Sequence, residues 1–298
     1  MKREIITAAD GKALSVAVWE CEAPKAMVQI SHGMAEHIAR YDAFAQYLNA
    51  RGFLVFGDDH RGHGETDPEA LGLAGEGDIF ALTVEDMRAL SRRFRERYGL
   101  PLVLLGHSYG SFLSQAYLLR GTDELAGCVL SGSALMAGAA VKMGRAIAKA
   151  RLKKKKDQPG DILAGLTFRS YDRKFKEGLN AWLSRDKAEV GKYNVDPYCG
   201  YTCSYGFYYW FFGGLLAIAG DNGAAANPAV RLYLTSGQRD HVGGKDAKLV
   251  QKLAARYRAM GYEPTVKIYE NARHEILNEI DRQAVYADIL AFIESCIA

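Results

Sequence analysis

The chain has 298 residues, of which 49% are hydrophobic and 24% charged, as expected for a globular protein with one large core and an inserted segment. Its 38 Lys and Arg against 35 Asp and Glu give a formal net charge of only +3, which argues against nucleic-acid binding. No apolar stretch follows the N-terminal basic residues, and the five cysteines are scattered and odd in number. We therefore expect a cytoplasmic protein without a secretory signal or a disulfide framework.

Short apolar segments typical of buried strands alternate along the chain with segments of helical periodicity. In chain order, strands are predicted at Leu14–Trp19, Ala26–Ser31, Phe53–Gly57, Leu102–Leu105, Gly127–Leu130, Val230–Thr235 and Thr265–Tyr269. The predicted helices are Ile38–Arg51, Val84–Tyr98, Ser111–Arg120, Lys245–Met260 and Arg282–Cys296. This alternation predicts an α/β protein with a doubly wound, mostly parallel sheet.

The alternation stops after Ser131, and no clear buried strand follows until Val230. We predict a core in two parts, residues 1–131 and 227–298, and a mainly helical cap inserted at 132–226. Open α/β sheets bind ligands at the carboxyl ends of their strands, and we expect the cap to cover that edge.

Three features of the cap have more than one interpretation. The uncharged stretch 197–220 is long enough to span a bilayer, but its Tyr, Gly, Ser and Thr content favours a buried or substrate-lining segment. The aromatic run 205–216 fits either a wall that binds an acyl group or packing of the cap on the core, and both interpretations stay open. The basic run Lys153–Lys156 is best interpreted as a solvated surface.

The sharpest local signal is the sequence Gly106-His-Ser-Tyr-Gly110, which has the G-x-S-x-G spacing. An apolar strand precedes it and a helix follows it, as a nucleophile elbow requires. The sharp turn brings strand and helix close together, so the residues two before and two after the serine must be small. We therefore predict Ser108 as the nucleophile.

A serine hydroxyl needs a general base, and the base needs an acid to orient it. In the elbow arrangement the chain order is serine, acid, histidine. Asp240 follows the strand at 230–235 and His274 follows the strand at 265–269. Asp246 is the chief competitor for the acid, but it is predicted within a helix. Of the seven histidines, five precede Ser108 and His241 adjoins the acid, so we predict His274 as the base.

Two backbone N–H groups should hold the oxyanion. One belongs to Tyr109, directly after the nucleophile. The other should come from the loop Ser31-His-Gly-Met-Ala-Glu-His, where Gly33 allows a sharp turn and Met34 supplies the N–H.

We predict no metal and no cofactor. His60 and His63 lack a third ligand at suitable spacing, and no His or Cys pair completes a site with Cys199 and Cys203. The segment Asp59–Gly64 is interpreted as a structural turn.

Together these segments resemble the monoacylglycerol lipase and lysophospholipase branch of the α/β-hydrolases, also labelled serine aminopeptidase-like. The resemblance rests on His32-Gly-Met-Ala-Glu-His with Arg40-Tyr41, Asp59-His-Arg-Gly-His-Gly, Gly106-His-Ser-Tyr-Gly, Gly237-Gln-Arg-Asp240 and Arg273-His274-Glu275. It implies the α/β-hydrolase fold, hydrolysis of a lipid-like ester, and a polar network of Glu36, His37 and Arg40 behind the oxyanion loop. Ser111 departs from the family, which often has glycine there, and the cap does not align.

The resulting prediction is a serine hydrolase that cleaves a small-molecule or lipid ester through an acyl-enzyme. Two alternatives remain: a small peptidase or amidase with the same triad, and a binding protein with slow turnover. We expect no nucleic-acid partner and no obligate protein partner, and transient contact of the cap with a membrane surface.

Overall fold

The computed structural model describes residues 1–122, 125–166 and 168–298, and within them eight strands form one sheet. The strands are β1 (Lys2–Thr7), β2 (Ala13–Trp19), β3 (Ala26–Ser31), β4 (Phe53–Asp58), β5 (Leu102–His107), β6 (Gly127–Ser131), β7 (Arg231–Gly237) and β8 (Thr265–Tyr269). Their order in the sheet is β1-β2-β4-β3-β5-β6-β7-β8. The pairs β1–β2 and β2–β4 are antiparallel and the others are parallel.

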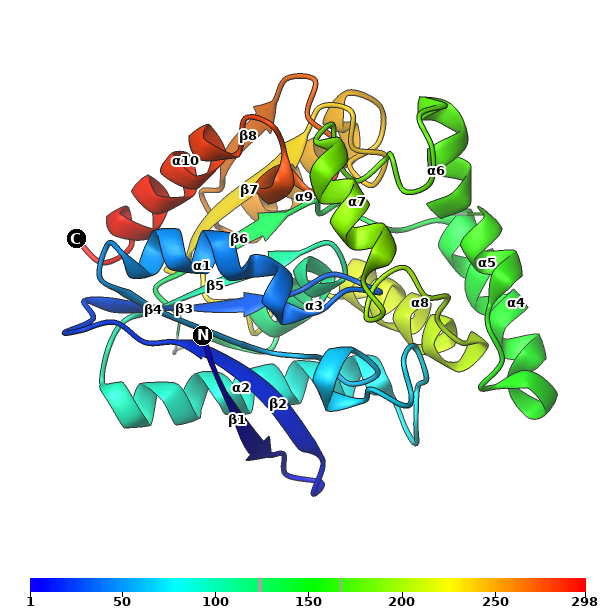
Figure 1. Cartoon of the computed structure of the whole chain (residues 1–298), viewed down its shortest axis with the longest axis horizontal. Coiled ribbons are helices and arrows are strands. Elements are labelled where there is room, and N and C mark those ends of the chain that lie inside the picture. Colours follow the sequence, from blue (N-terminus) through cyan, green and yellow to red (C-terminus); the bar gives the residue numbers. More distant parts are fainter. Residues whose placement is uncertain (123–124, 167) are drawn as a thin grey trace.

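Helices cover both faces of the sheet (Figure 1). One face packs on α1 (Asp42–Asn49) and α10 (Arg282–Ser295), and the other packs on α2 (Ile79–Tyr98), α3 (Tyr109–Leu118) and α9 (Lys248–Ala259). The central strand β5 is buried on both sides, and its side chains enter the two cores alternately. This is the continuous apolar pattern expected of a parallel strand between two helical layers.

The described residues between β6 and β7 form the helices α4 (Ala139–Lys155), α5 (Asp161–Leu166), α6 (Phe168–Phe175), α7 (Lys187–Val195) and α8 (Tyr205–Gly220). Figure 1 shows α4, α5 and α6 at one end of the molecule, opposite the C-terminus. These helices lie within 132–226, the segment for which an inserted cap is predicted, and this segment is called the insertion below.

All seven predicted strands are present, and the structure adds β1, which sequence reasoning missed. This edge strand buries Ile6 but leaves Ile5 exposed, so its apolar residues do not make a recognisable pattern. The helix predicted from Val84 begins five residues earlier, at Ile79, where the Asp78 side chain caps it.

Two other helical predictions need correction. The segment predicted as one helix from Ile38 begins as a 3-10 turn, Ile38–Tyr41, before α1. The helix predicted from Lys245 begins as another 3-10 turn, Lys245–Ala247, in which Asp246 has a positive φ of 52°. In neither segment does a side-chain cap mark the first residue of the α-helix, so the sequence does not show where it begins.

The uncharged stretch 197–220 is helical only from Tyr205, in α8. Among the helices of the described residues, none is long and apolar enough to cross a membrane. The interpretation of this stretch as a buried or lining segment is confirmed, because Phe207 and Tyr208 are buried.

Candidate active site

Ser108 lies at the sharp turn between β5 and α3. Its backbone has φ 51° and ψ −116°, a strained conformation for a residue with a side chain. The turn leaves Ser108 only partly buried although its neighbours His107 and Tyr109 are buried. The strained turn therefore places the Ser108 hydroxyl at the carboxyl edge of the sheet.

The two glycines of the motif allow this turn because they leave no room for a side chain. A Cβ on Gly110 would lie 2.0 Å from the Ser31 carbonyl oxygen of β3. A Cβ on Gly106 would lie 2.3 Å from Ser114 Oγ and 2.5 Å from the Gly110 carbonyl oxygen. The close approach of strand and helix predicted from the motif is confirmed.

Asp240 and His274 form a hydrogen-bonded pair at the same edge. Asp240 Oδ1 lies 2.9 Å from His274 Nδ1, and both side chains are buried. The other carboxylate oxygen of Asp240 accepts from Ser236 Oγ at 3.1 Å, and the Val242 N–H donates to Oδ1 at 2.9 Å. Asp246, the competitor for the acid, is exposed.

The charges of this pair stabilise each other. Burial alone would raise the pKa of Asp240, but the His274 imidazole and the hydrogen bonds from Val242 and Ser236 lower it below its ordinary value. Burial alone would lower the pKa of His274, but the Asp240 carboxylate outweighs it and raises that pKa above its ordinary value. The arrangement therefore favours a carboxylate that can stabilise a protonated imidazole.

The loops that carry Asp240 and His274 run against each other. The Gln238 N–H donates to the Tyr269 carbonyl at 2.8 Å, and the Arg239 N–H donates to the Ala272 carbonyl at 2.9 Å. A Cβ on Gly237 would lie 2.1 Å from the Arg273 carbonyl oxygen, so this approach requires glycine.

Aromatic rings from the insertion and from β5 pack against the His274 ring. The ring centroid of Trp182 lies 4.8 Å from that of His274, and that of His107 lies 4.8 Å away as well. His274 Nε2 is buried and, among the described residues, has no hydrogen-bond partner. Burial, followed by the neighbouring His274, lowers the pKa of His107 to about 4, so His107 is neutral at pH 7.

The predicted oxyanion donors lie beside Ser108. Tyr109 is the first residue of α3, so its N–H has no acceptor within the helix. Met34 and Ser108 line the same cavities. The turn after Met34 depends on Ala35, which has a positive φ of 54°. The Ala35 carbonyl accepts from Tyr193 Oη at 2.9 Å and from the Gly200 N–H at 3.0 Å, so the insertion holds the oxyanion loop in place.

A buried ionic network lies behind this loop. Glu36 accepts from the Gly33 N–H at 2.5 Å and from Tyr41 Oη at 2.8 Å. Arg40 binds Glu36 and makes two bonds of 2.7 Å to Glu275. The network thus joins the oxyanion loop to the residue after His274.

The structure corrects one expectation drawn from the family resemblance. His37 does not belong to the network that contains Glu36 and Arg40. Its Nε2 lies 2.9 Å from Asp196 Oδ2 in the insertion, and its side chain makes no hydrogen bond or ion pair with Glu36 or Arg40 among the described residues. The sequence neighbours Glu36 and His37 have side chains with different partners, one in the core and one in the insertion.

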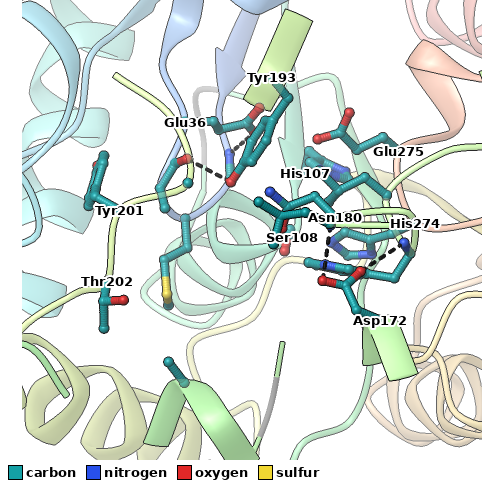
Figure 2. A pocket seen from close by; sticks show the side chains of 18 of the residues that line it. Glu36, His107, Ser108, Asp172, Asn180, Tyr193, Tyr201, Thr202, His274 and Glu275 are labelled. Carbon is teal, nitrogen blue, oxygen red and sulfur yellow. Dashed lines mark hydrogen bonds between the residues drawn. The ribbon is translucent and has the colours of Figure 1, made fainter. Parts of the chain in front are cut away.

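Two cavities meet at Met34 and Ser108. One, of about 190 Å³, is the more polar of the two and is called the polar cavity. Its walls contain apolar residues such as Leu179 and Leu183, together with the polar side chains of His107, Asp172, Asn180, Tyr193, Thr202 and His274. Figure 2 shows Asp172 and Tyr201 on opposite sides of this cavity, with Ser108 between them. The other, of about 340 Å³, has apolar walls that include Phe112, Val141, Leu163, Phe211, Phe212 and Leu215.

The aromatic run 205–216 packs on the core and also lines the apolar cavity, so packing is confirmed and the acyl-binding wall stays a prediction. Tyr208, Phe211, Phe212 and Leu215 line the apolar cavity. Phe207 is fully buried and packs on Tyr109 with a ring-centroid distance of 5.3 Å.

His60, His63 and Asp59 belong to a buried turn and have structural roles. His60 lies 3.0 Å from Asp58 Oδ2 and 2.8 Å from Ser31 Oγ, and burial lowers the pKa of His63 to about 3. Asp59 accepts from the N–H groups of Ile38 and Glu65, which confirms the structural turn.

One group within the described residues has donor atoms close enough to hold a metal ion. His37, Asp196 and Cys199 place one donor atom each within 4.8 Å of one another. The His37–Asp196 hydrogen bond already satisfies two of these donors, and burial raises the pKa of the Cys199 thiol. The group therefore contains a neutral thiol, whereas a metal would need a thiolate. Sequence spacing could not reveal it, since His37 is far upstream.

Sequence reasoning also missed several wall residues. Trp182, Tyr193, Asp172 and Asn180 all belong to the insertion and line the polar cavity. No spacing pattern marks them, because they come from different helices and loops.

The comparisons with known proteins agree with this geometry. The family model described as "Serine aminopeptidase, S33" matches residues 22–281. This chain belongs to that family. Within the α/β-hydrolases it belongs to the monoacylglycerol lipase branch. It is a serine ester hydrolase.

Two curated relatives match most of both chains. Monoacylglycerol lipase of Mycolicibacterium smegmatis is 30% identical over 278 residues, 91% of this chain and 89% of the relative. Human monoglyceride lipase is 29% identical over 275 residues, 91% of this chain and 83% of the relative.

Solved structures confirm the predicted α/β-hydrolase fold. A carboxyl esterase from Bacillus coagulans, solved with glycerol, superimposes with a TM-score of 0.91 at 25% identity, covering 100% of this chain and 99% of the esterase. Monoglyceride lipase of Saccharomyces cerevisiae superimposes with a TM-score of 0.76 at 20% identity, covering 99% of this chain and 94% of the lipase.

Proposed function

We propose that this serine hydrolase cleaves a lipid-like ester of the monoacylglycerol or lysophospholipid type. The observation that carries the proposal is the meeting of an apolar and a polar cavity at Ser108. The apolar cavity suits an acyl chain, and the polar cavity suits a hydroxylated alcohol. The names of the human and Mycolicibacterium relatives and the glycerol in the Bacillus esterase structure support this assignment.

The proposed chemistry is acyl transfer in two steps. His274 Nε2 takes the proton of Ser108 Oγ, which attacks the ester carbonyl carbon. The Met34 and Tyr109 N–H groups stabilise the oxyanion, and Asp240 stabilises the protonated imidazole. The tetrahedral intermediate expels the alcohol, which receives the proton from His274. Water then attacks the acyl-enzyme with His274 again as the base, and the acid leaves.

We propose that residues 132–226 act as a cap over this site. Tyr193 and Trp182 from the insertion line the polar cavity, and Tyr208 lines both cavities. The insertion therefore supplies most of the surface that would distinguish one substrate from another.

A peptidase acting on a free N-terminal amine is the second candidate, and Asp172 is the observation that favours it. Glu36 and Glu275 also line the polar cavity, but both are paired with Arg40. Asp172 accepts backbone N–H bonds from Asn180 at 2.9 Å and Trp182 at 3.4 Å and has no cationic partner among the described residues. Its carboxylate can bind either an ammonium group or hydroxyls.

A substrate panel separates the candidates. The panel contains p-nitrophenyl esters of increasing acyl length, a monoacylglycerol, a lysophosphatidylcholine and aminoacyl p-nitroanilides, each assayed with wild type and Ser108→Ala. We expect ester turnover that falls by roughly 10³-fold or more in Ser108→Ala. Ser111→Ala is the matched control, since it removes a buried hydroxyl whose one hydrogen bond among the described residues is to the Ser108 carbonyl.

Each outcome assigns one function. Faster turnover of anilides than of esters would replace the lipase proposal with the peptidase. Binding without turnover of any substrate would indicate the slow binding protein. Equal activity of Ser108→Ala and wild type would contradict the proposed mechanism, in which Ser108 is the nucleophile.

The location and the partners are proposals as well. All five cysteines are free thiols, which is consistent with a reducing cytoplasm. No obligate protein partner is proposed. Transient contact of the cap with a membrane surface is proposed as well.

A further inference from the structure

One cluster of metal-ligand side chains outside the candidate active site joins the core to the insertion. His37 follows the oxyanion loop in the core, whereas Asp196 directly follows α7 in the insertion. Cys199 lies in the next turn, where its N–H donates to the Asp196 carbonyl at 3.0 Å. One donor atom from each side chain lies within 4.8 Å of the other two. These three residues are called the His37 cluster.

The cluster offers ligands that zinc accepts. Imidazole nitrogen, thiolate sulfur and carboxylate oxygen bind Zn²⁺ at about 2.0–2.3 Å, which sets neighbouring ligand atoms roughly 3.3–3.6 Å apart in a tetrahedron. Donor atoms within 4.8 Å of one another therefore need to move by only about 1 Å. The mixture of nitrogen, sulfur and oxygen favours zinc over Ca²⁺ or Mg²⁺, which prefer oxygen ligands.

Neighbouring groups orient two of the three ligands. The Tyr198 N–H donates to Asp196 Oδ1 at 2.8 Å, which leaves Oδ2 facing His37 Nε2 at 2.9 Å. The Tyr198 ring packs edge-on against the His37 ring at a centroid distance of 5.8 Å. Contacts of this kind hold the ligands of metal sites in place. Exposed fractions of 11% for the His37 side chain and 28% for that of Asp196 show that solvent, and hence an ion, reaches both.

The charged groups around the cluster have an excess of negative charge. Glu36 and Glu275 share one guanidinium, that of Arg40, so this buried network carries one uncompensated negative charge. Asp196 adds a second, since no Lys or Arg pairs with it in the described part of the chain. The network and Asp196 both interact electrostatically with the Cys199 thiol. A divalent cation would balance this excess, because buried charges in proteins are paired or bound to metals.

Binding requires two protons to move. Because a carboxylate only accepts hydrogen bonds, His37 Nε2 carries the proton that it shares with Asp196. On binding, the imidazole keeps one proton, which passes through water to Nδ1, and the Nε2 lone pair faces the ion. The S–H bond of Cys199 breaks as the sulfur–metal bond forms, and this proton leaves to solvent. The neutral thiol is therefore a cost to metal binding that coordination can outweigh.

We propose that His37, Asp196 and Cys199 bind a divalent transition-metal ion of the zinc type, with water as the fourth ligand. One ligand belongs to the core and two belong to the insertion, so the ion cross-links these parts of the chain. Sequence spacing does not reveal the site, because His37 and Asp196 are 159 residues apart. The alternative, in which the hydrogen bond and the thiol only pack the insertion on the core, predicts no specific metal binding.

The position of the ion gives it a role beside the oxyanion loop. Gly200 follows Cys199, and its N–H donates to the Ala35 carbonyl at 3.0 Å. Ala35 in turn follows Met34, whose N–H is the predicted oxyanion donor. The metal bonds thus reinforce a contact through which the insertion already holds this loop. This role does not depend on which ester the protein cleaves.

The test measures metal binding to the full chain after dialysis against a chelator, without any substrate. Calorimetry gives the affinity and stoichiometry for Zn²⁺, and Co²⁺ reports a thiolate ligand through its charge-transfer absorption band. The test variants are Cys199→Ala and Asp196→Asn, and circular dichroism confirms that each is folded. The matched control is Cys21→Ala, which removes another partly buried free thiol. His274→Ala tests binding at the candidate active site, where Nε2 has no partner among the described residues.

We expect wild type, Cys21→Ala and His274→Ala to bind one Zn²⁺ per chain and to show the cobalt–thiolate band. Both cluster variants should bind Zn²⁺ about a hundredfold more weakly or worse, since losing a residue that only orients a ligand costs about 10- to 100-fold. Cys199→Ala should also lose the cobalt band. Zn²⁺ should raise the midpoint of thermal unfolding in wild type and Cys21→Ala but not in the cluster variants.

Four results would overturn the inference. They are the absence of stoichiometric Zn²⁺ binding by wild type, a cobalt complex without the thiolate band, equally tight binding by wild type and both cluster variants, and binding that is lost only in His274→Ala. The last result would place the ion at the candidate active site instead. Because no arm of the test needs turnover, its failure leaves the proposed ester hydrolysis unaffected.

Discussion

The Oδ1 atom of Asp240 lies 2.9 Å from Nδ1 of His274, and both side chains are buried. Since the carboxylate accepts the Nδ1 proton, the neutral imidazole presents Nε2 as the basic nitrogen. Nε2 has no hydrogen-bond partner among the described residues, and His274 lines the cavity that also contains Ser108. The pair is therefore set to accept a proton from a group in the cavity.

The pH dependence of activity should report this pair. Burial lowers the pKa of His274, but the Asp240 carboxylate outweighs burial and raises it above the ordinary value. Only the neutral imidazole is a base, so activity is lost as pH falls through this pKa. We predict that the acid limb of the kcat/KM profile of an activated ester has its midpoint above about 6.5.

Asp240→Asn provides the control for this assignment. The variant should lower the midpoint, because the carboxylate no longer favours the protonated ring. Its kcat should fall by about 10⁴-fold, since the imidazole loses its orientation. A profile with an unchanged midpoint would show that Asp240 does not act on the titrating base.

The elbow should not accept a methyl group at Gly110. A Cβ there would lie 2.0 Å from the Ser31 carbonyl oxygen, so strand and helix would have to separate. We predict that Gly110→Ala lowers the free energy of unfolding by about 3 kcal/mol or more, measured by urea denaturation.

Gly191→Ala is the matched control, because Gly191 lies within α7 and a Cβ there would meet nothing within 4 Å. It should stabilise the protein by roughly 0.5–1 kcal/mol through helix propensity. Equal stabilities of the two variants would contradict the close packing of the elbow.

Arg40 should contribute strongly to stability. It bonds both Glu36 and Glu275, and all three side chains are largely buried. Arg40→Ala leaves two buried carboxylates without their cation, and we predict a loss of about 3–5 kcal/mol in the free energy of unfolding. Arg120→Ala, which breaks the exposed pair with Glu85, should cost under about 1 kcal/mol. A similarly small loss of unfolding free energy in both variants would contradict the stabilising role of the Arg40 network.

The same network predicts an acid dependence of stability. Burial raises the pKa of Glu275, but Arg40 outweighs it and lowers that pKa to about 2. The ordinary pKa of this carboxyl is 4.5. The stabilisation is therefore complete above that pH and is lost as pH falls toward about 2. Thermal unfolding measured across this range should show a smaller acid loss in Glu275→Gln than in wild type.

The apolar cavity should select acyl length. Val141 in α4 lines its wall and is buried. We predict that Val141→Phe lowers kcat/KM for long-chain p-nitrophenyl esters by about tenfold or more, while butyrate changes by less than about twofold. Ala146→Phe is the control, since it adds the same ring on the exposed face of α4. An equal loss for short and long esters would argue that the acyl chain lies elsewhere.

The core, and the positions of Ser108, Asp240 and His274 at one edge of the sheet, were predictable because local patterns encode them. The strand β5 is continuously apolar, and the glycines around Ser108 have no space for a side chain. Asp240 and His274 follow β7 and β8, and parallel strands bring their carboxyl ends to one edge.

The insertion was not predictable in the same detail. Asp172, Tyr193 and Trp182 reach the cavity through tertiary packing, which leaves no periodic trace in the sequence. His37 likewise pairs with Asp196, 159 residues away, rather than with its neighbour Glu36. Edge strand β1 was missed because its pairing with β2, and not its apolar pattern, holds it in the sheet.

The measurement that tests the central claim most directly is intact-protein mass spectrometry after reaction with a fluorophosphonate, followed by peptide mapping. The account predicts one adduct per chain on Ser108, no adduct in Ser108→Ala, and labelling slowed by orders of magnitude in His274→Ala. An adduct on another residue, or labelling of Ser108→Ala at the rate of wild type, would contradict it.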